Sequence, residues 1–136
     1  NDLGTSGQVL TTNGGGGTTT GTLTWTTASG GGSAPVVTEQ NTNATLSAPS
    51  SGVIEEIYTV NAGSTVTLTL VSSATCGEGF KYNIKRLGGG SVVVQCAGSD
   101  EFIDVASQKS YTISSQYDSV TLVANNTSPH ASWLII

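Results

Sequence analysis

A strict alternation of apolar and polar residues between positions 64 and 71 restricts this part of the chain to extended structure. The apolar members are Val66, Leu68 and Leu70, and threonines stand between them. This period of two is typical of a strand with one face buried and the other in solvent. The alternation returns over residues 80–85, where Tyr82 is expected to face the core. No segment has sustained helical periodicity, so the pattern predicts an all-β chain.

About eight strand-like segments separated by turn residues follow one another from residue 53 to the C-terminus. They are residues 53–60, 64–71, 80–85, 91–96, 102–105, 110–114, 119–124 and 131–136. Gly88-Gly89-Gly90 is predicted to turn one strand into the next as a hairpin. Short strands at this spacing predict an antiparallel β-sandwich or jelly roll.

The composition excludes several classes of protein. Thr, Ser and Gly supply 57 of the 136 residues, which leaves too few good helix formers for a helical bundle. No window approaches the roughly 18 to 20 unbroken apolar residues of a membrane span, so no membrane insertion is expected. The formal net charge of −5 would repel phosphates on average, which argues against nucleic acid as a partner. No cofactor is expected either.

Residues 1–34 differ from the rest of the chain, because they combine a Gly/Thr background with a single charge, Asp2. A segment this small cannot bury Leu23 and Trp25 by itself, since the entropy lost on ordering would exceed the hydrophobic gain. It is therefore a flexible linker or a strand pair packed against something else, and the tryptophan favours packing against identical chains. The start without Met indicates a processed chain or a fragment of a longer one.

The remaining residues divide into a transition and a domain. Residues 35–52 are interpreted as a transition that closes with a turn at Pro49-Ser50-Ser51-Gly52. Residues 53–136 are predicted to form the β-sandwich domain. Its core is small for an independent domain, and its edge strands need partners, which favours an oligomer.

One phrase near the N-terminus carries a resemblance. It reads Gly4-Thr5-Ser6-Gly7-Gln8-Val9-Leu10-Thr11-Thr12-Asn13-Gly14, followed after a glycine-rich spacer by Leu23-Thr24-Trp25. Residues 4–27 thereby resemble a module of phage and viral tail-fibre proteins, and the closing Trp133-Leu134-Ile135-Ile136 is similar to the end of their C-terminal head domains. The resemblance implies a homotrimeric fibre, with residues 1–34 as a thin shaft that leads into a compact head.

The function that this resemblance implies is attachment. The chain would be a virion component, extracellular when functioning, whose head binds a receptor on the host surface, with a glycan as the expected receptor. Its partners would be two further copies of itself, that receptor and other virion proteins. A capsid-decoration or tail-joining protein is the first alternative, and a glycan-cleaving fibre enzyme is the less favoured second. The chain is expected not to be an enzyme.

Some side chains are candidates for contacts. Leu23, Trp25 and Trp133 are expected at the interface of the trimer. Candidates for receptor contact are Tyr117, Lys81, Lys85 and His130. Tyr117 precedes Asp118 at a turn and is the better exposed tyrosine for stacking on a sugar. Lys81 and Lys85 share one face of a strand, although ordinary solubilising charge is the favoured interpretation of this pair.

The residues typical of catalysis and metal binding do not form a convincing site. Glu55 and Glu56 are neighbours on a strand and point to opposite faces, so they would not flank a glycosidic bond. His130 stands alone, and one histidine among many serines does not predict a triad. The acidic residues at positions 100, 101 and 104 are interpreted as a solvated turn rather than a Ca²⁺ loop, because the ordered ligand spacing is missing.

The two cysteines, Cys76 and Cys96, allow two interpretations of similar weight. They form a disulfide, or they are two small buried hydrophobic residues in a β core. A zinc site is much less favoured, because it would need the single histidine and distant carboxylates as further ligands. No metal site is therefore predicted.

Overall fold

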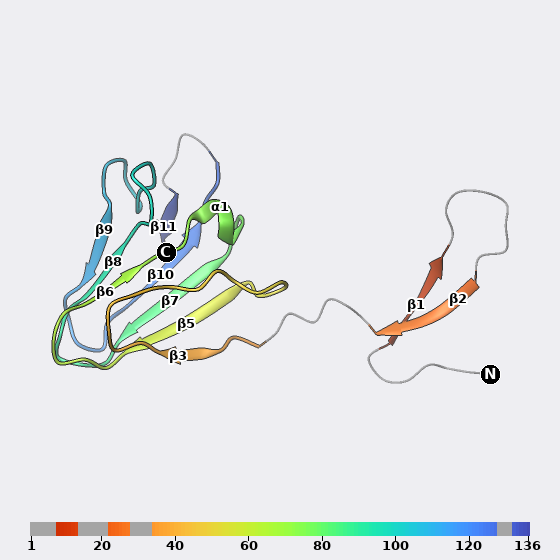
Figure 1. Ribbon diagram of the computed structural model, residues 1–136, viewed down its shortest axis with the longest axis horizontal. Coiled ribbons are helices and arrows are strands. Elements are labelled where there is room, and N and C mark those ends of the chain that lie inside the picture. Colours follow the sequence, from red (N-terminus) through yellow and green to blue (C-terminus); the bar gives the residue numbers. More distant parts are fainter. Residues whose placement is uncertain (1–7, 14–21, 28–33, 128–131) are drawn as a thin grey trace. The chain divides into compact units, whose positions relative to one another are not determined.

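The computed structural model describes residues 8–13, 22–27, 34–127 and 132–136, with side chains described from residue 34 onward (Figure 1). The chain forms two compact units, Asn1–Gly32 and Ser33–Ile136. In the first unit β1 (Gln8–Asn13) and β2 (Thr22–Thr27) form an antiparallel pair in which Leu10 is the backbone partner of Trp25. A strand pair was one of the two interpretations of this segment.

The second unit contains two sheets and almost no helix. The five-stranded sheet has the order β11-β10-β7-β5-β3, and the four-stranded sheet has the order β4-β6-β8-β9. The strands are β3 (Val37–Glu39), β4 (Ala44–Thr45), β5 (Glu55–Val60), β6 (Val66–Thr69), β7 (Lys81–Arg86), β8 (Val92–Gln95), β9 (Ser110–Ile113), β10 (Ser119–Ala124) and β11 (Trp133–Ile135). A single helical turn, α1 (Ser73–Cys76), is the one helix of the described residues. The prediction of an all-β chain is confirmed.

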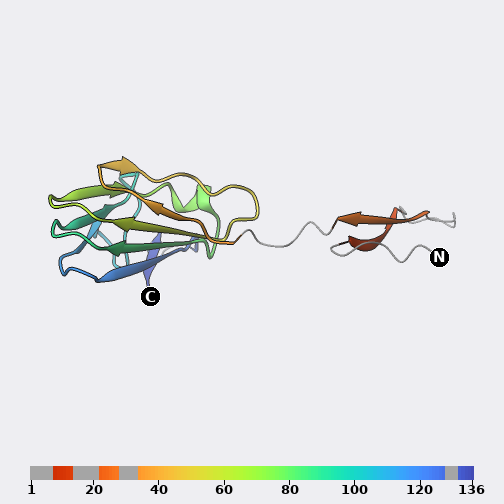
Figure 2. The same cartoon turned by 90° about the horizontal axis from the view of Figure 1, so that it is seen from below.

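The chain crosses from one sheet to the other between β3 and β4, between β5 and β6, and between β7 and β8. Between these crossings the chain returns to the five-stranded sheet, so successive strands of one sheet run in the same direction. The parallel neighbours are β3 with β5, β5 with β7, β4 with β6, and β6 with β8. The later strands β9, β10 and β11 add antiparallel pairs (Figures 1 and 2). The expectation of a purely antiparallel arrangement is wrong, because alternation shows which face of a strand is buried but not which strand lies beside it.

The glycine segment Gly88–Gly90 does not form the predicted hairpin, since it leads from β7 in one sheet to β8 in the other. It stacks on the preceding crossing, where the Gly90 amide donates to the Ala62 carbonyl at 2.8 Å. A Cβ atom would lie 2.2 Å from the Ala62 oxygen at Gly88 and 1.9 Å from the Ser64 oxygen at Gly90. The glycines are needed because two backbone segments approach each other too closely for side chains.

Two further expectations about the second unit need correction. Residues 35–52, interpreted as a transition, carry β3 and β4 and so supply an edge strand to each sheet. The predicted turn at their end is present, because the Val53 amide donates to the Ser50 carbonyl at 3.0 Å and Gly52 has a φ of 82°. Residues 102–105, predicted as a strand, form only an isolated bridge between Ile103 and Trp133.

Buried residues of both sheets and of the segments next to their strands form one hydrophobic core. They are Leu46, Tyr58, Val60, Val66, Leu68, Leu70, Phe80, Tyr82, Ile84, Val92, Val94, Ile103, Ile113, Val120, Leu122, Ala124 and Trp133. The alternation in β6 and β7 is confirmed, since every second residue there is buried. Trp133 is 0 % exposed within its own chain. This burial does not fit the contact with a partner chain that was expected of Trp133.

None of the helical segments among the described residues has the length and apolar character needed to cross a lipid bilayer.

Candidate functional site

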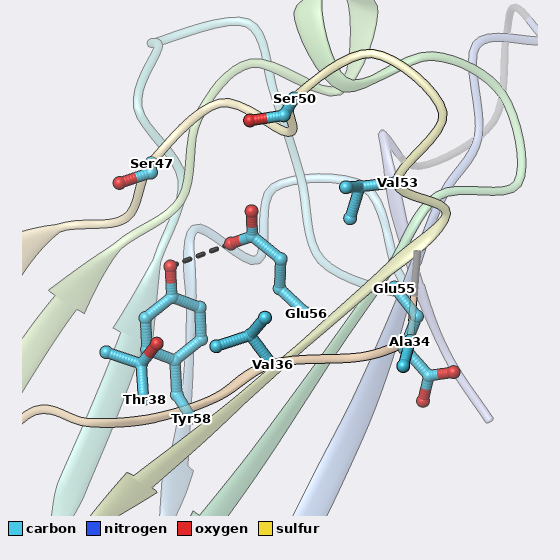
Figure 3. A pocket seen from close by; sticks show the side chains of 9 residues that line it. All are labelled: Ala34, Val36, Thr38, Ser47, Ser50, Val53, Glu55, Glu56 and Tyr58. Carbon is cyan, nitrogen blue, oxygen red and sulfur yellow. Dashed lines mark hydrogen bonds between the residues drawn. The ribbon is translucent and has the colours of Figure 1, made fainter. Parts of the chain in front are cut away.

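A hollow of about 380 Å³ lies beside the start of β5 (Figure 3). It is lined by Ala34, Val36, Thr38, Ser47, Ser50, Val53, Glu55, Glu56 and Tyr58. These residues come from β3 and the residues before it, from the loop after β4, and from β5. We call it the Glu56 hollow, because the Glu56 side chain extends into its centre.

The alternation of β5 sends its two adjacent carboxylates to opposite sides of the sheet. Glu56 shares the core-facing side with Tyr58, whereas Glu55 accepts a hydrogen bond from the Asn83 side chain on the outer side. Asn83 in turn accepts one from the Thr121 hydroxyl. The prediction that Glu55 and Glu56 point apart is confirmed. The pair therefore lacks the facing geometry of two glycosidase carboxylates.

A hydrogen bond between Tyr58 and Glu56 forms one wall of the Glu56 hollow (Figure 3). The Tyr58 hydroxyl donates to Glu56 Oε2 at 2.7 Å, and the tyrosine is 6 % exposed. Burial raises the pKa of Tyr58 to about 12, and the hydrogen bond to Glu56 adds to that rise. The phenol is thus a neutral donor at physiological pH. Among the described residues, no donor reaches the other carboxylate oxygen, Oε1.

A second tyrosine anchors the loop that borders the hollow. The Tyr82 hydroxyl donates to the main-chain carbonyl of Ser47 at 2.7 Å and lies 3.7 Å from Cys76 Sγ. Its ring packs against Tyr58, Phe80 and Trp133 at centroid distances of 6.1, 4.9 and 5.3 Å. Burial raises the pKa of Tyr82 far above its ordinary value. The Glu56 hollow is therefore bordered on the Ser47 side by a loop held to the core.

A different candidate surface surrounds Tyr117. Residues 114–118, the Tyr117 turn, join β9 to β10. Tyr117 is 63 % exposed and has a φ of 68°, a left-handed conformation that residues other than glycine rarely adopt. The Lys85 ammonium donates to the Tyr117 carbonyl, and the Tyr117 amide donates to the Arg86 carbonyl at 3.0 Å. The Gln116 side chain adds a bond to the Leu87 carbonyl at 2.8 Å.

The structure brings together two of the four predicted receptor-binding residues. Lys85 and Tyr117 are in contact, and the exposure of Tyr117 agrees with its prediction. Lys81 shares the outer face of β7 with Lys85, as predicted, but lies about 13 Å away along the strand. His130 lies outside the described residues. The side chains of Leu23 and Trp25 also lie outside the described part, so their interface role stays a prediction.

The two cysteines are separate thiols, each partly buried against the core. Burial raises the pKa of Cys76, and it raises the pKa of Cys96 to about 11. This geometry corresponds to the interpretation as small core residues rather than to the disulfide.

Two of the three acidic residues at positions 100–104 accept hydrogen bonds from backbone amides of distant segments. Glu101 Oε1 accepts from the Ser73 amide at 2.8 Å, and Asp104 Oδ1 accepts from the Ile135 amide at 3.4 Å. Within residues 34–127 and 132–136, no three His, Cys, Asp or Glu side chains gather as metal ligands.

Sequence reasoning did not identify the Glu56 hollow, although a signal for it exists. Glu56 has the same parity as Tyr58 and Val60, so a carboxylate occupies the inward face of a strand. A charged residue on a buried face needs a polar partner or an opening to solvent. The position of the loop from Ser47 to Val53 beside it could not be predicted from that pattern.

A comparison with known protein families finds none whose pattern matches this chain, and a search of curated proteins finds no matching relative.

Proposed function

We propose that this chain is a component of a trimeric virion fibre and that its C-terminal unit binds a glycan-bearing receptor on the host cell. The observation that carries the receptor part of this proposal is the Tyr117 turn. It presents an exposed aromatic ring on a backbone held by hydrogen bonds, one of which comes from the Lys85 ammonium to the Tyr117 carbonyl. The binding is non-catalytic.

The chemistry of the Tyr117 turn suits an anionic sugar. A tyrosine ring offers an apolar face for stacking on a sugar ring and a hydroxyl for a polar contact. The ammonium of Lys85 supplies a positive charge for a carboxylate or sulfate on the same ligand. Because the turn is fixed before binding, little conformational entropy is lost when the ligand arrives.

The fibre part of the proposal rests on the N-terminal unit. An isolated two-stranded hairpin is marginally stable in water, so β1 and β2 need further chains or strands to be stable. Identical copies around an axis supply them, in line with the resemblance of residues 4–27 to tail-fibre modules. We further propose that the two sheets of the second unit are the layers of a sandwich-like head. Three heads would give three weak sites and a gain in avidity.

The receptor part is tested by a glycan array with the full chain, Tyr117→Ala, and Val105→Ala as a matched loss of an exposed apolar side chain. We expect the wild type and Val105→Ala to bind sialylated, uronic acid or sulfated glycans, and Tyr117→Ala to lose at least about tenfold in affinity. Lys85→Gln should weaken binding of anionic glycans more than that of neutral ones.

Three outcomes would count against this receptor site. Unchanged binding by Tyr117→Ala would remove the Tyr117 turn from the proposal. Binding to another virion protein without any glycan binding would favour a capsid-decoration or tail-joining role. Release of shortened glycans by the wild type would replace the binding role with that of an enzyme.

The trimer is tested by sedimentation equilibrium of the full chain and of Trp25→Ala. We expect three chains per particle for the wild type and a shift to smaller species for Trp25→Ala, because this variant removes the largest apolar side chain of β2. A wild type that sediments as a stable monomer contradicts the fibre arrangement.

A further inference from the structure

The Glu56 hollow has a combination of groups that selects for the charge of a ligand. Glu56 extends into it, and its Oε2 atom is already occupied by the Tyr58 hydroxyl. Its Oε1 atom has no donor among the described residues. No lysine or arginine lines the hollow, so no cation of the described chain compensates this carboxylate.

The other residues that line the hollow contribute hydroxyl groups and apolar side chains. Ser47 and Ser50 stand on one side, and the side chains of Val36 and Val53 lie across from each other near Glu56 (Figure 3). Val36 is 69 % exposed, which is a large unburied area for a valine at the rim of a hollow. A ligand with a short aliphatic part would cover this area and remove it from water.

We propose that the Glu56 hollow binds a primary ammonium group carried on a short aliphatic stem. The ammonium donates to Glu56 Oε1, and its two remaining protons are available to the hydroxyls of Ser47 and Ser50. The stem packs against Val36 and Val53. A small free alkylamine and the side chain of a lysine share this chemistry.

The proposal distinguishes amines from other ligands on physical grounds. A carboxylate or phosphate would be repelled by Glu56, which has no neighbouring cation to offset its charge. An alcohol can donate one hydrogen bond to Oε1, but a bond between two charged groups is stronger than one with a neutral donor. A ligand that only accepts hydrogen bonds finds no free donor at Tyr58, because that hydroxyl is bonded to Glu56.

The site is distinct from the Tyr117 turn and does not depend on the proposed glycan binding. Glu55 and Glu56 open β5 beside Lys81 and Tyr82, whereas the Tyr117 turn contacts Lys85 and Arg86 at the other end of β7. Loss of one site therefore leaves the residues of the other in place.

The test is a titration of the ¹⁵N-labelled full chain with butylammonium, butanol and butyrate, three probes of similar size and different charge. We expect butylammonium to shift the amide signals of Ser47, Val53 and Tyr58 and to bind about tenfold more tightly than butanol. Butyrate should not bind. Nα-acetyl-lysine methylamide is a fourth probe, and whichever of the two amines binds more tightly identifies a free amine or a lysine side chain as the natural source.

Two isosteric variants make the test specific. Glu56→Gln keeps an acceptor for the Tyr58 hydroxyl but removes the charge, so it should abolish the preference for butylammonium over butanol. Glu39→Gln removes a charge from β3, outside the lining of the hollow, and should leave that preference unchanged. Equal binding of butylammonium and butanol, no shifts at the named amides, or an equal loss in both variants would overturn the proposal. None of these results bears on glycan binding at Tyr117.

Discussion

The side chain of Lys85 donates a hydrogen bond to the main-chain carbonyl of Tyr117, across 32 positions of sequence. This bond ties the end of β7 to the Tyr117 turn and holds an exposed tyrosine in a left-handed conformation. Strained backbone of this kind persists where the surrounding structure determines it, and it gathers at binding sites.

Tyr117→Gly should bind glycan more weakly but unfold no more easily than the wild type. Glycine adopts a positive φ without the steric cost that tyrosine has, so stability should stay equal or rise by up to about 1 kcal/mol. Ser107→Gly is a matched control, because Ser107 is exposed and has a φ of 75°. Urea denaturation should show a similar change in the free energy of unfolding for both variants, while only Tyr117→Gly loses glycan binding. A Tyr117→Gly variant that unfolds much more easily would show that the ring stabilises the fold.

Gly90→Ala should destabilise the second unit strongly, whereas Gly89→Ala should not. The Cβ atom added at Gly90 would lie 1.9 Å from the Ser64 carbonyl oxygen, and at Gly89 nothing lies within 4 Å. We expect a loss of about 3 kcal/mol or more for Gly90→Ala, since main chain must move, and a change within about 0.5 kcal/mol for Gly89→Ala. Urea denaturation followed by circular dichroism measures both. Equal free energies of unfolding for the two variants would contradict the close approach of Gly88–Gly90 to Ala62–Ser64.

The free energy of unfolding should fall as the pH rises above 10. The folded pKa of Tyr58 is raised from 10.0 to about 12, so the protonated phenol stabilises the fold fully below pH 10 and this contribution is lost as the pH approaches 12. Tyr58→Phe should therefore show a shallower loss between pH 10 and 12. It should also be less stable by about 1 kcal/mol at pH 7, because the bond to Glu56 is missing. Urea titrations at several pH values test this, with Tyr111→Phe as control.

The two cysteines should be present as free thiols that react slowly. Burial raises the pKa values of Cys76 and Cys96, and the thiolate is the reactive form. In denaturant without reductant, we expect an aromatic disulfide reagent to titrate two thiols per chain. The folded protein at pH 7.5 should react at least about tenfold more slowly. A purified chain with no titratable thiol would instead show the disulfide.

Several features of the fold and the sites could be predicted from residues alone. The alternation around Leu68 and Tyr82 correctly identified the buried faces of β6 and β7, because a strand turns every second side chain to the same side. The same rule placed Glu55 and Glu56 on opposite faces and Lys81 and Lys85 on one face. The turn position of Tyr117 predicted its exposure. Each of these is a local property of one strand or turn.

The partners of the strands were not predictable in this way. A glycine-rich turn such as Gly88–Gly90 is compatible with a hairpin and with a crossing between sheets. Its interpretation as a hairpin predicted antiparallel strands. A signal was present, because the pairing of β5 with β7 and of β6 with β8 repeats at an offset of 26 residues. The segments Ala62–Ser64 and Gly88–Gly90 share that offset, which is typical of stacked repeats.

The amino-acid sequence by itself determined that this chain is all-β and which side of most strands is buried, since the period of two is set by backbone geometry. Only the tertiary structure decided that β3, β5 and β7, and likewise β4, β6 and β8, pair in parallel. It also decided that Lys85 contacts Tyr117 and that a loop borders Glu56 beside Tyr58. Those contacts join residues far apart along the chain. They form because the strands pack on one shared core, and the local pattern of each strand does not encode its neighbour.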